Sequence, residues 1–494
     1  MWISYKFQHG INIFGKNSDF FQEVKKMSFS ERTTDFLGKR SAVEAATAAA
    51  RKRIGLILDS ESFMEVGAFV KSRDTEFGAQ EAAEGVVTGW GTVDGAPVCV
   101  FAQDSSAMGG AVSEMQAKKI TALYEYALKV GIPVVGIFDS KGAKLAEGVD
   151  ALDGYAKIIA SAQAASGVVP TIAVISGICG GAAAIAASCF DFVISAGNGE
   201  IYMHSPTVLT ANGISAKADA ESVAANGIAD FAAKDDAEAA GLVRALLSYL
   251  PANNAGDKNY SATSDDINRA LDVNALASCD PKIVAATVAD NSALFEVGAA
   301  FAPAVTTGFI RLDGETIGVV GANGELSADA LSKASKFVSF CDAFGVSILN
   351  IVNASGFELS ASFERNGISA AATLAGCYAG ASSAMVTLIT GKAIGSAYVT
   401  LCPKALGADM TFAWPTAEIS ALSADAAVAM FGSEELKASD DPIAKRAELT
   451  EKYAEILAAP YEAAKHGYID EIIDPAETRQ ALVYAFGLFS TKNV

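Results

Sequence analysis

The chain has 494 residues, enough for two or more domains, and 57 acidic against 37 basic residues give it a formal charge of −20. Apolar residues make up 51% of the chain and charged residues 19%, which supports a large core and excludes a disordered protein. The acidic balance, and the absence of dense Lys/Arg clusters from the sequence, argue against a nucleic-acid-binding protein.

The cysteines are scattered, at positions 99, 179, 189, 279, 341, 377 and 402. None has the two-residue spacing of a zinc knuckle or a redox pair, so we expect free thiols in a reducing compartment and a cytoplasmic protein. Residues 1–26 lack a basic stretch followed by a continuous apolar run, which argues against a secretory signal. We expect these residues to form an N-terminal arm, with Met27 as an alternative start.

The second half of the chain repeats the first. Four stretches recur in the same order, and the offset between the two members of a pair shrinks from 231 to 214 residues along the chain. The matched ranges are 58–68 with 289–299, 88–95 with 307–314, 131–139 with 345–353, and 174–182 with 388–396. An ordered repeat of this length predicts two copies of one domain of roughly 200 residues.

In chain order, each copy begins with two apolar strands joined by an Asp-Gly turn, the strongest short hairpin signal. An amphipathic helix follows, then a buried strand, a further helix, and a strand that enters a glycine-rich turn. This order predicts an α/β domain whose ligand loops lie at the strand ends. The turns are 94–95 and 313–314, the helices 113–130 and 328–344, and the buried strands end at Asp139 and Asn353. We interpret residues 207–283 as the last helices of the first copy and a linker.

Residues 158–190 contain no charged side chain and are long enough to cross a bilayer. Glycines and Pro170 interrupt them, so a strand, a glycine turn and a helix of small residues explain the stretch equally well. The equivalent turn of the second copy contains Lys392, and a charge at that place is costly in a membrane-spanning helix. We therefore predict no membrane span.

Side chains for the familiar catalytic mechanisms are scarce in the repeated core. A Ser-His-Asp hydrolase needs a histidine base, and the sequence has only His9, His204 and His466. His204 is the sole candidate near a predicted active loop, and we interpret it as structural. No local spacing predicts a metal site, and the glycine motifs that bind phosphate or dinucleotides are absent from the sequence.

Backbone amides remain as candidate catalytic groups. Residues 180–182 and 395–397 lie where a strand ends and a helix of small residues begins, so unpaired N–H groups are expected to point outward there. Such groups stabilise a developing oxyanion. Close packing of a helix on a strand also favours Gly and Ala, and it stays an alternative for either turn alone. Two turns at equivalent repeat positions favour a functional role.

On these residues, the chain resembles the carboxyltransferase subunits of biotin-dependent acyl-CoA carboxylases, transcarboxylases and decarboxylases. The resemblance runs from about residue 27 to the C-terminus and implies an α/β fold of two tandem crotonase-like (ββα superhelix) domains. It implies an acyl-CoA domain with its linker over 27–283 and a biotin domain over 284–494. The stretches that carry it are 85–89, 101–104, 109–110, 119–120, 139–144, 147–149, 244–254 (RALLSYLPANN), 340–344 and 413–419 (AWPTAEI).

The resemblance implies an enzyme that transfers a carboxyl group between carboxybiotin on a carrier protein and an acyl-CoA such as propionyl- or methylmalonyl-CoA. No metal is expected in this chain. Carried over by motif, the two oxyanion sites would be formed by Gly181 and Ala182 for the thioester and by Gly395 and Ser396 for biotin. The acyl-CoA contacts would be Ser140, Lys141, Gly142, Ala143, Lys144, Cys179 and Gly180. The biotin contacts would be Gly356, Phe357, Ala393 and Ile394.

The implied partners are a biotinyl carrier protein, a biotin carboxylase or membrane decarboxylase subunits, and further copies of the chain in a homodimer or trimer of dimers. The chain departs from the family pattern in three places. Lys141 and Lys144 replace a Gly and an Arg of the first-domain loop, and the family's paired glycines become Gly181-Ala182 and Gly395-Ser396. Basic residues usual after the turn at 354–357 are missing. Two alternatives therefore stay open: a non-catalytic scaffold paralogue, and a biotin-independent crotonase-type hydratase or isomerase.

Overall fold

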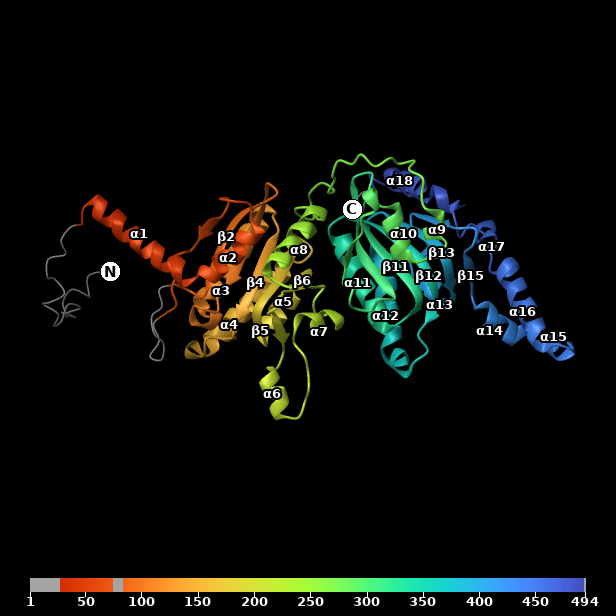
Figure 1. Ribbon diagram of the computed structural model, residues 1–494, viewed down its shortest axis with the longest axis horizontal. Coiled ribbons are helices and arrows are strands. Elements are labelled where there is room, and N and C mark those ends of the chain that lie inside the picture. The colour runs from red at the N-terminus through yellow and green to blue at the C-terminus, as the bar shows by residue number, and fades with distance from the viewer. Residues whose placement is uncertain (1–26, 74–82, 493–494) are drawn as a thin grey trace, which may run out of the picture.

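The computed structural model describes residues 27–73 and 83–492, and the expected N-terminal arm, 1–26, lies outside the described residues. The two halves of the chain lie along the long axis of the molecule, and each is built on one eight-stranded sheet (Figure 1). The mixed α/β architecture and the duplication that the sequence predicts are confirmed.

The first sheet has the strand order β1-β2-β3-β4-β5-β6-β8, and β7 pairs with β5 off this path. β1, β2 and β3 are antiparallel, and the other pairs are parallel. The turn between β2 and β3 is the predicted Asp-Gly hairpin. The strands are β1 Met64–Val66, β2 Val86–Val93, β3 Ala96–Gln103, β4 Val134–Ser140, β5 Thr171–Gly180, β6 Phe192–Ser195, β7 Glu200–Tyr202 and β8 Phe231–Ala232.

Helices connect the parallel strands of the first half, and α1, α2 and α8 lie before and after the strands of its sheet in the chain. The predicted helix 113–130 is α3: the Ser113 hydroxyl accepts a hydrogen bond from the Gln116 N–H at 2.9 Å, and Gly131 ends the helix in the left-handed region. The helices are α1 Phe29–Ala46, α2 Ala48–Ile57, η2 Met108–Gly110, α3 Glu114–Val130, η3 Leu145–Glu147, α4 Val149–Ala165, α5 Ala182–Ser188, α6 Pro206–Ala211, α7 Ala220–Ala225 and α8 Asp236–Tyr249.

The second sheet repeats this pattern, with the order β16-β14-β13-β12-β11-β10-β9 and with β15 paired to β13. β9, β10 and β11 are antiparallel, and the other pairs are parallel. The strands are β9 Phe295–Val297, β10 Val305–Leu312, β11 Glu315–Leu326, β12 Ser347–Phe357, β13 Met385–Ile394, β14 Met410–Ala413, β15 Glu418–Ser420 and β16 Glu471–Ile472.

The helices of the second half begin before its first strand. The expected boundary between residues 283 and 284 falls inside α10, which packs on the second sheet. The predicted helix 328–344 is α11. The helices are α9 Val273–Leu276, α10 Pro281–Val288, η4 Asp290–Ser292, α11 Ala328–Ala343, α12 Ala361–Gly380, α13 Gly395–Thr400, η5 Lys404–Leu406, α14 Ala424–Phe431, α15 Ser433–Ala438, α16 Pro442–Lys452, η6 Tyr453–Leu457, α17 Pro460–Lys465, η7 Pro475–Glu477 and α18 Thr478–Leu488.

The duplication extends to the carboxylates that hold the hairpin turns. Asp59 accepts hydrogen bonds from the two N–H groups of the 94–95 turn at 3.1 and 2.9 Å. Asp290, its repeat equivalent, accepts those of the 313–314 turn at 3.1 and 2.8 Å. Backbone hydrogen bonds stabilise the ionised carboxylate, and the bond from Gly95 is the largest cause that lowers the pKa of Asp59 to about 2.

Each half also buries one lysine on the helix that follows its hairpin. Lys119 of α3 donates from Nζ to the carbonyl oxygen of Val86 at 2.5 Å. Lys333 of α11 donates to the carbonyl oxygens of Phe301 and Val305 at 2.8 and 2.7 Å. Because burial disfavours the charged ammonium, it lowers the pKa of both lysines to about 8.

The two halves share an apolar contact. One cluster of buried side chains contains residues from strands of both sheets. Phe192 of β6 lies edge-on to Phe309 of β10 and Phe340 of α11, with ring centroids 6.2 and 4.7 Å apart. Both halves therefore contribute to one core where they meet.

The uncharged stretch 158–190 consists of the second part of α4, then β5 and α5. Across the described residues, none of the helices combines the length and the apolar character that crossing a membrane requires.

Candidate functional site

The first candidate turn joins β5 to α5. Gly181 adopts φ 60° and ψ −122°, a conformation that glycine reaches without the clash of a Cβ. Its own N–H donates to the carbonyl oxygen of Tyr202 at 2.9 Å, so it belongs to the β5–β7 pairing. Ala182 is the first residue of α5. The Ile185 N–H donates to the Gly181 carbonyl oxygen, which is the first hydrogen bond of the helix. The N–H of Ala182 comes before this bond and is therefore among the N–H groups that a helix start leaves without an intrahelical acceptor.

The second candidate turn has a glycine with nearly the same φ. Gly395 follows β13 with φ 59°, and α13 runs on from it to Thr400. Ala182 and Ser396, which stand where the family carries glycines, are absent from the residues of positive φ. Each left-handed position has therefore kept its glycine, and the substituted positions retain an N–H at the start of a helix, where the dipole is positive.

A polar side chain lies against the strand that leads into each turn, buried in the first half and half-buried in the second. In the first half, Asp139 accepts hydrogen bonds from Arg53 at 2.7 Å and from the hydroxyl of Ser105 at 2.9 Å. A Cβ on Gly177 would lie 2.1 Å from the Asp139 carboxylate, so this contact requires glycine. The side chains of Asp139 and Arg53 are 9% and 16% exposed, which makes them a mostly buried ion pair.

The second half has an amide at the equivalent place. Asn353 accepts a hydrogen bond from the N–H of Lys392 at 2.9 Å and donates to Asn323 at 3.0 Å. A Cβ on Gly391 would lie 2.2 Å from the Asn353 oxygen, so the close approach is the same as in the first half. The close contact between the strand glycine and a polar side chain is therefore repeated, but the carboxylate of the first half is replaced by a neutral amide.

The residues expected to contact acyl-CoA lie at the end of β4 and β5. The hydroxyl of Ser140 accepts the N–H of Gly142 at 3.2 Å, and Ala143 bridges to Val112. Lys141 is exposed on this loop, whereas Lys144 is 11% exposed and its ammonium lies 3.3 Å from the buried carboxylate of Glu147. Lys141 is therefore the free cation of the pair, and the charge of Lys144 is compensated.

The other two expected acyl-CoA residues, Cys179 and Gly180, end β5 beside the turn. Burial raises the pKa of the Cys179 thiol far above its ordinary value, which keeps it protonated and unreactive. A Cβ on Gly180 would lie 2.5 Å from the ring of Tyr202, so that ring covers the strand end.

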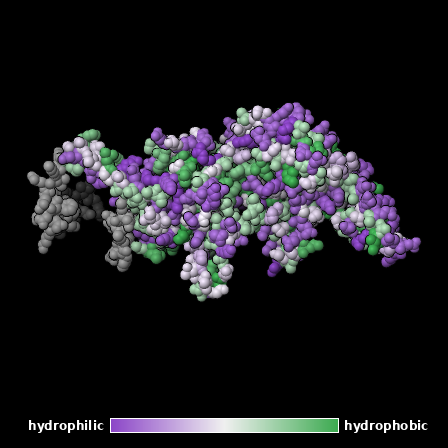
Figure 2. Space-filling view, in the orientation of Figure 1, coloured by the Kyte–Doolittle hydropathy of each residue, from purple (hydrophilic) through white to green (hydrophobic). Residues whose placement is uncertain are grey.

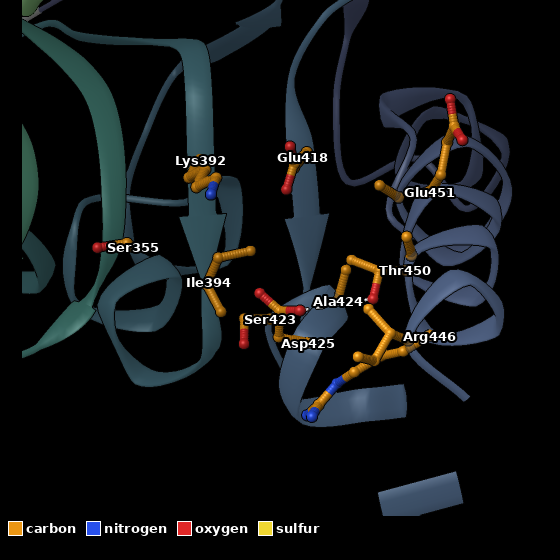
Figure 3. Close-up of a pocket in the computed structure, with 13 residues that line it drawn as sticks. Ser355, Lys392, Ile394, Glu418, Ser423, Ala424, Asp425, Arg446, Thr450 and Glu451 are labelled. Carbon is orange, nitrogen blue, oxygen red and sulfur yellow. Dashed lines mark hydrogen bonds between the residues drawn. The ribbon is translucent and has the colours of Figure 1, made fainter. Parts of the chain in front are cut away.

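Beside the second turn lies a cavity of about 550 Å³ (Figure 3). Ile394, an expected biotin residue, lines it from the end of β13. Ala393 is fully buried, Gly356 has φ 146°, and the ring of Phe357 stacks on Phe363 at 5.0 Å. The other lining residues come from strand ends and from α14, α16 and the turn after α16: Ser355, Lys392, Glu418, Ser423, Ala424, Asp425, Ile443, Arg446, Ala447, Thr450, Glu451 and Ala454.

A second cavity of about 600 Å³ lies on the α13 side of this turn and contains residues that sequence reasoning missed. Gly395 and Ser396 line it together with His466 and Tyr468, which follow α17. The rings of His466 and Tyr468 are 6.0 Å apart. No local sequence signal points to His466, because only the fold brings the segment after α17 to the end of β13.

The described residues contain no group of three His, Cys, Asp or Glu side chains placed to hold a metal ion. Each of the two turns combines backbone N–H groups at a helix start with a strand end at its side. Two such donors can polarise two carbonyl groups.

Comparison with known proteins supports one family. A model of the carboxyl transferase domain matches residues 43–494. The chain is 37% identical to the methylmalonyl-CoA carboxyltransferase 12S subunit of Propionibacterium freudenreichii subsp. shermanii, over 90% of this chain and 88% of that one. It is 38% identical to the methylmalonyl-CoA decarboxylase subunit alpha of Veillonella parvula, over 90% of both chains. It is also 38% identical to the propionyl-CoA carboxylase beta chain of Roseobacter denitrificans, over 90% and 91%.

The fold agrees with these sequences. A crystal structure of transcarboxylase 12S, described as a hexamer with methylmalonyl-coenzyme A and methylmalonic acid bound, matches with a TM-score of 0.89 and 34% identity. The match covers 95% of this chain and 96% of that one. The chain therefore belongs to the carboxyl transferase domain family and is a carboxyltransferase.

Proposed function

We propose that the protein transfers a carboxyl group between an acyl-CoA and biotin on a carrier protein, as the carboxyltransferase subunit of an acyl-CoA carboxylase or decarboxylase. The observation that carries the proposal is the pair of repeat-equivalent turns, each with a left-handed glycine followed by the first N–H groups of a helix. The names of the relatives favour propionyl- and methylmalonyl-CoA as the acyl-CoA pair.

Each turn would serve one substrate. The first domain, 27–283, would hold the acyl-CoA, with the thioester oxygen at the Gly181–Ala182 turn and the CoA phosphates near the exposed Lys141. The second domain, 284–494, would hold biotin at the Gly395–Ser396 turn. The cavities of about 550 and 600 Å³ beside that turn are large enough for a bicyclic ring, which supports the assignment.

The chain would act through position and charge stabilisation. Carboxybiotin would supply the carboxyl group and a ring nitrogen, so that the nitrogen–carboxyl bond breaks, a bond to the α-carbon of the acyl-CoA forms, and the α-proton moves to the nitrogen. The Ala182 N–H would donate to the thioester oxygen as negative charge develops there. The Ser396 N–H would donate to the ureido oxygen of biotin. No side-chain base of the chain is needed.

The proposed partners are a biotinyl carrier protein, further subunits of a carboxylase or decarboxylase, and other copies of this chain. The apolar side chains of Leu145, the first residue of η3, and Val149, the first residue of α4, are 90% and 74% exposed and support assembly of several copies. The transcarboxylase 12S relative is described as a hexamer. Seven free cysteines support a reducing compartment, for which we propose the cytoplasm.

The direct test is transfer from a carboxyacyl-CoA to free biotin. We expect the purified protein to convert methylmalonyl-CoA or malonyl-CoA to propionyl-CoA or acetyl-CoA only when biotin is present. Loss of the carboxyacyl-CoA without biotin, or no transfer with any thioester, would overturn the proposal. Binding of an active paralogue without turnover would identify a scaffold, and hydration of an enoyl-CoA would identify a crotonase-type enzyme.

A further inference from the structure

The strands that lead into the two turns differ in charge at one of their last positions. Ile178 of β5 pairs in register with Glu200 of β7, and the equivalent Lys392 of β13 pairs with Glu418 of β15. Strand geometry places these side chains on the face opposite the 177 and 391 glycines, and two residues before the end of the strand. The first strand thus presents an apolar side chain beside its turn, and the second presents an ammonium group.

The surroundings of this position differ as well. In the first half, the ring of Tyr202 covers Gly180, which follows Ile178 by two residues. In the second half, Ile394 is the equivalent of Gly180. Its partner on the neighbouring strand is Ser420, where the first half has Tyr202. No tyrosine ring thus pairs with this strand end, and Ile394 lines the cavity of about 550 Å³.

Lys392 lines this cavity; a hydrogen bond holds its backbone, and its ammonium forms no ion pair with the described residues. Its N–H is held by Asn353 at 2.9 Å, and its neighbours along the wall are Ile394 and Ser355 (Figure 3). Within the described part of the chain, no carboxylate lies within 4.0 Å of its ammonium. Arg53 and Lys144, behind and beside the first turn, are by contrast both paired with carboxylates.

The cavity is not cationic as a whole. Lys392 and Arg446 face three carboxylates, those of Glu418, Asp425 and Glu451. An anion would therefore be drawn there by a local ion pair and not by the field of the cavity. Glu418, the cross-strand neighbour of Lys392, would compete with it for the ammonium.

We propose that the ligand at the second turn extends from the cavity that Gly395 and Ser396 line into the neighbouring cavity of about 550 Å³, where the Lys392 ammonium binds its carboxylate, so that this turn favours carboxybiotin over biotin. This inference rests on the proposed function and adds a specificity-determining residue to it. The apolar Ile178 gives the first turn no such preference, which agrees with an acyl chain as its ligand.

The test separates the carboxylated ligand from the uncarboxylated one. With freshly prepared carboxybiotin and propionyl-CoA, we expect Lys392→Met to raise the KM for carboxybiotin about tenfold, because one charge-assisted contact is lost. The inhibition constant of biotin and the KM for propionyl-CoA should stay at their wild-type values. Lys392→Arg should restore most of the loss, and Glu418→Gln should lower the KM for carboxybiotin.

Two outcomes would overturn the inference alone. One is a Lys392→Met variant with unchanged KM for carboxybiotin, and the other is a parallel shift in the inhibition constant of biotin. Ile178→Met is the matched control at the equivalent position and should leave the constants for both biotin ligands unchanged. Absence of transfer by the wild-type protein would overturn the proposed function, and this inference with it.

Discussion

The two glycine turns have similar φ values and differ in their charges. Gly181 and Gly395 have φ values of 60° and 59°, Gly181 directly before α5 and Gly395 as the first residue of α13. Beside the strand that leads into the first turn is an aspartate paired with Arg53, and beside the second is an asparagine paired with Asn323. Both halves therefore place backbone N–H groups at the start of a helix, while the side chains around the two turns differ in charge.

The largest effect is expected from removing a donor at each turn. Proline is tolerated in the first turn of a helix and lacks an N–H, so Ala182→Pro and Ser396→Pro delete one donor each with little change in fold. Loss of one oxyanion donor lowers kcat by about 10²–10³. Rates of carboxyl transfer from methylmalonyl-CoA to biotin measure the effect.

The matched controls keep the amide. Ala182→Ser and Ser396→Ala exchange the side chains of the two turns and should transfer at nearly wild-type rates. Proline variants that are folded and fully active would show that these amides do not take part. Proline at Gly395 itself would be a poorer test, because its fixed negative φ conflicts with the observed 59°.

The next effect concerns stability behind the turns. Asp139→Asn removes the carboxylate that lies 2.7 Å from the mostly buried Arg53 and leaves it only Asp236 at 3.2 Å, which we expect to lower the free energy of unfolding by about 2 kcal/mol. Asn353→Asp, the reciprocal change, breaks no ion pair and should cost less. Urea denaturation measures the free energy of unfolding of both variants, provided that its dependence on urea concentration is unchanged. Equal losses of stability would contradict the contrast between the two halves.

A smaller effect distinguishes the buried lysines by pH. Lys119 and Lys333 have pKa values of about 8 in the folded protein, below the 10.5 of an exposed lysine. Between these values the unfolded chain binds more protons, so each lysine makes stability rise as pH increases from about 8 to 10.5. The rise should reach about 2 kcal/mol for each lysine.

Lys119→Met and Lys333→Met should each remove part of this rise, which urea midpoints at pH 8 and pH 10 would show. Because the two lysines occupy equivalent positions, the two variants should behave alike. If only one variant lost part of the rise, the buried lysine would contribute to the pH dependence of stability in only one half.

The smallest effect is expected at the glycines of positive φ. Gly181→Ala meets only the Met203 carbonyl oxygen at 3.9 Å, so its cost is conformational, on the order of 1–3 kcal/mol at φ 60° and ψ −122°. Gly395→Ala also approaches the Ala421 carbonyl oxygen at 3.2 Å and should be less stable than Gly181→Ala. Thermal midpoints measure the order, and the reverse order would indicate that the second turn relaxes more freely.

The repeat, the two hairpins and the position of both turns could be predicted because they depend on local patterns of Gly, Asp and apolar residues. The donor assignment could be predicted only in part. The N–H of Gly181 donates to the carbonyl oxygen of Tyr202, and nothing in the sequence of the turn indicates that β7 pairs there. His466 and the free charge of Lys392 could not be predicted, because both depend on segments that meet only in the folded chain.

Equilibrium binding to the two proline variants shows whether the two turns bind different ligands. Propionyl-CoA would be titrated by calorimetry, and biotin binding would be followed by ligand-observed NMR. We expect Ala182→Pro to weaken the binding of propionyl-CoA and to leave that of biotin unchanged, and Ser396→Pro to do the reverse. Equal weakening of both ligands in either variant would contradict this expectation.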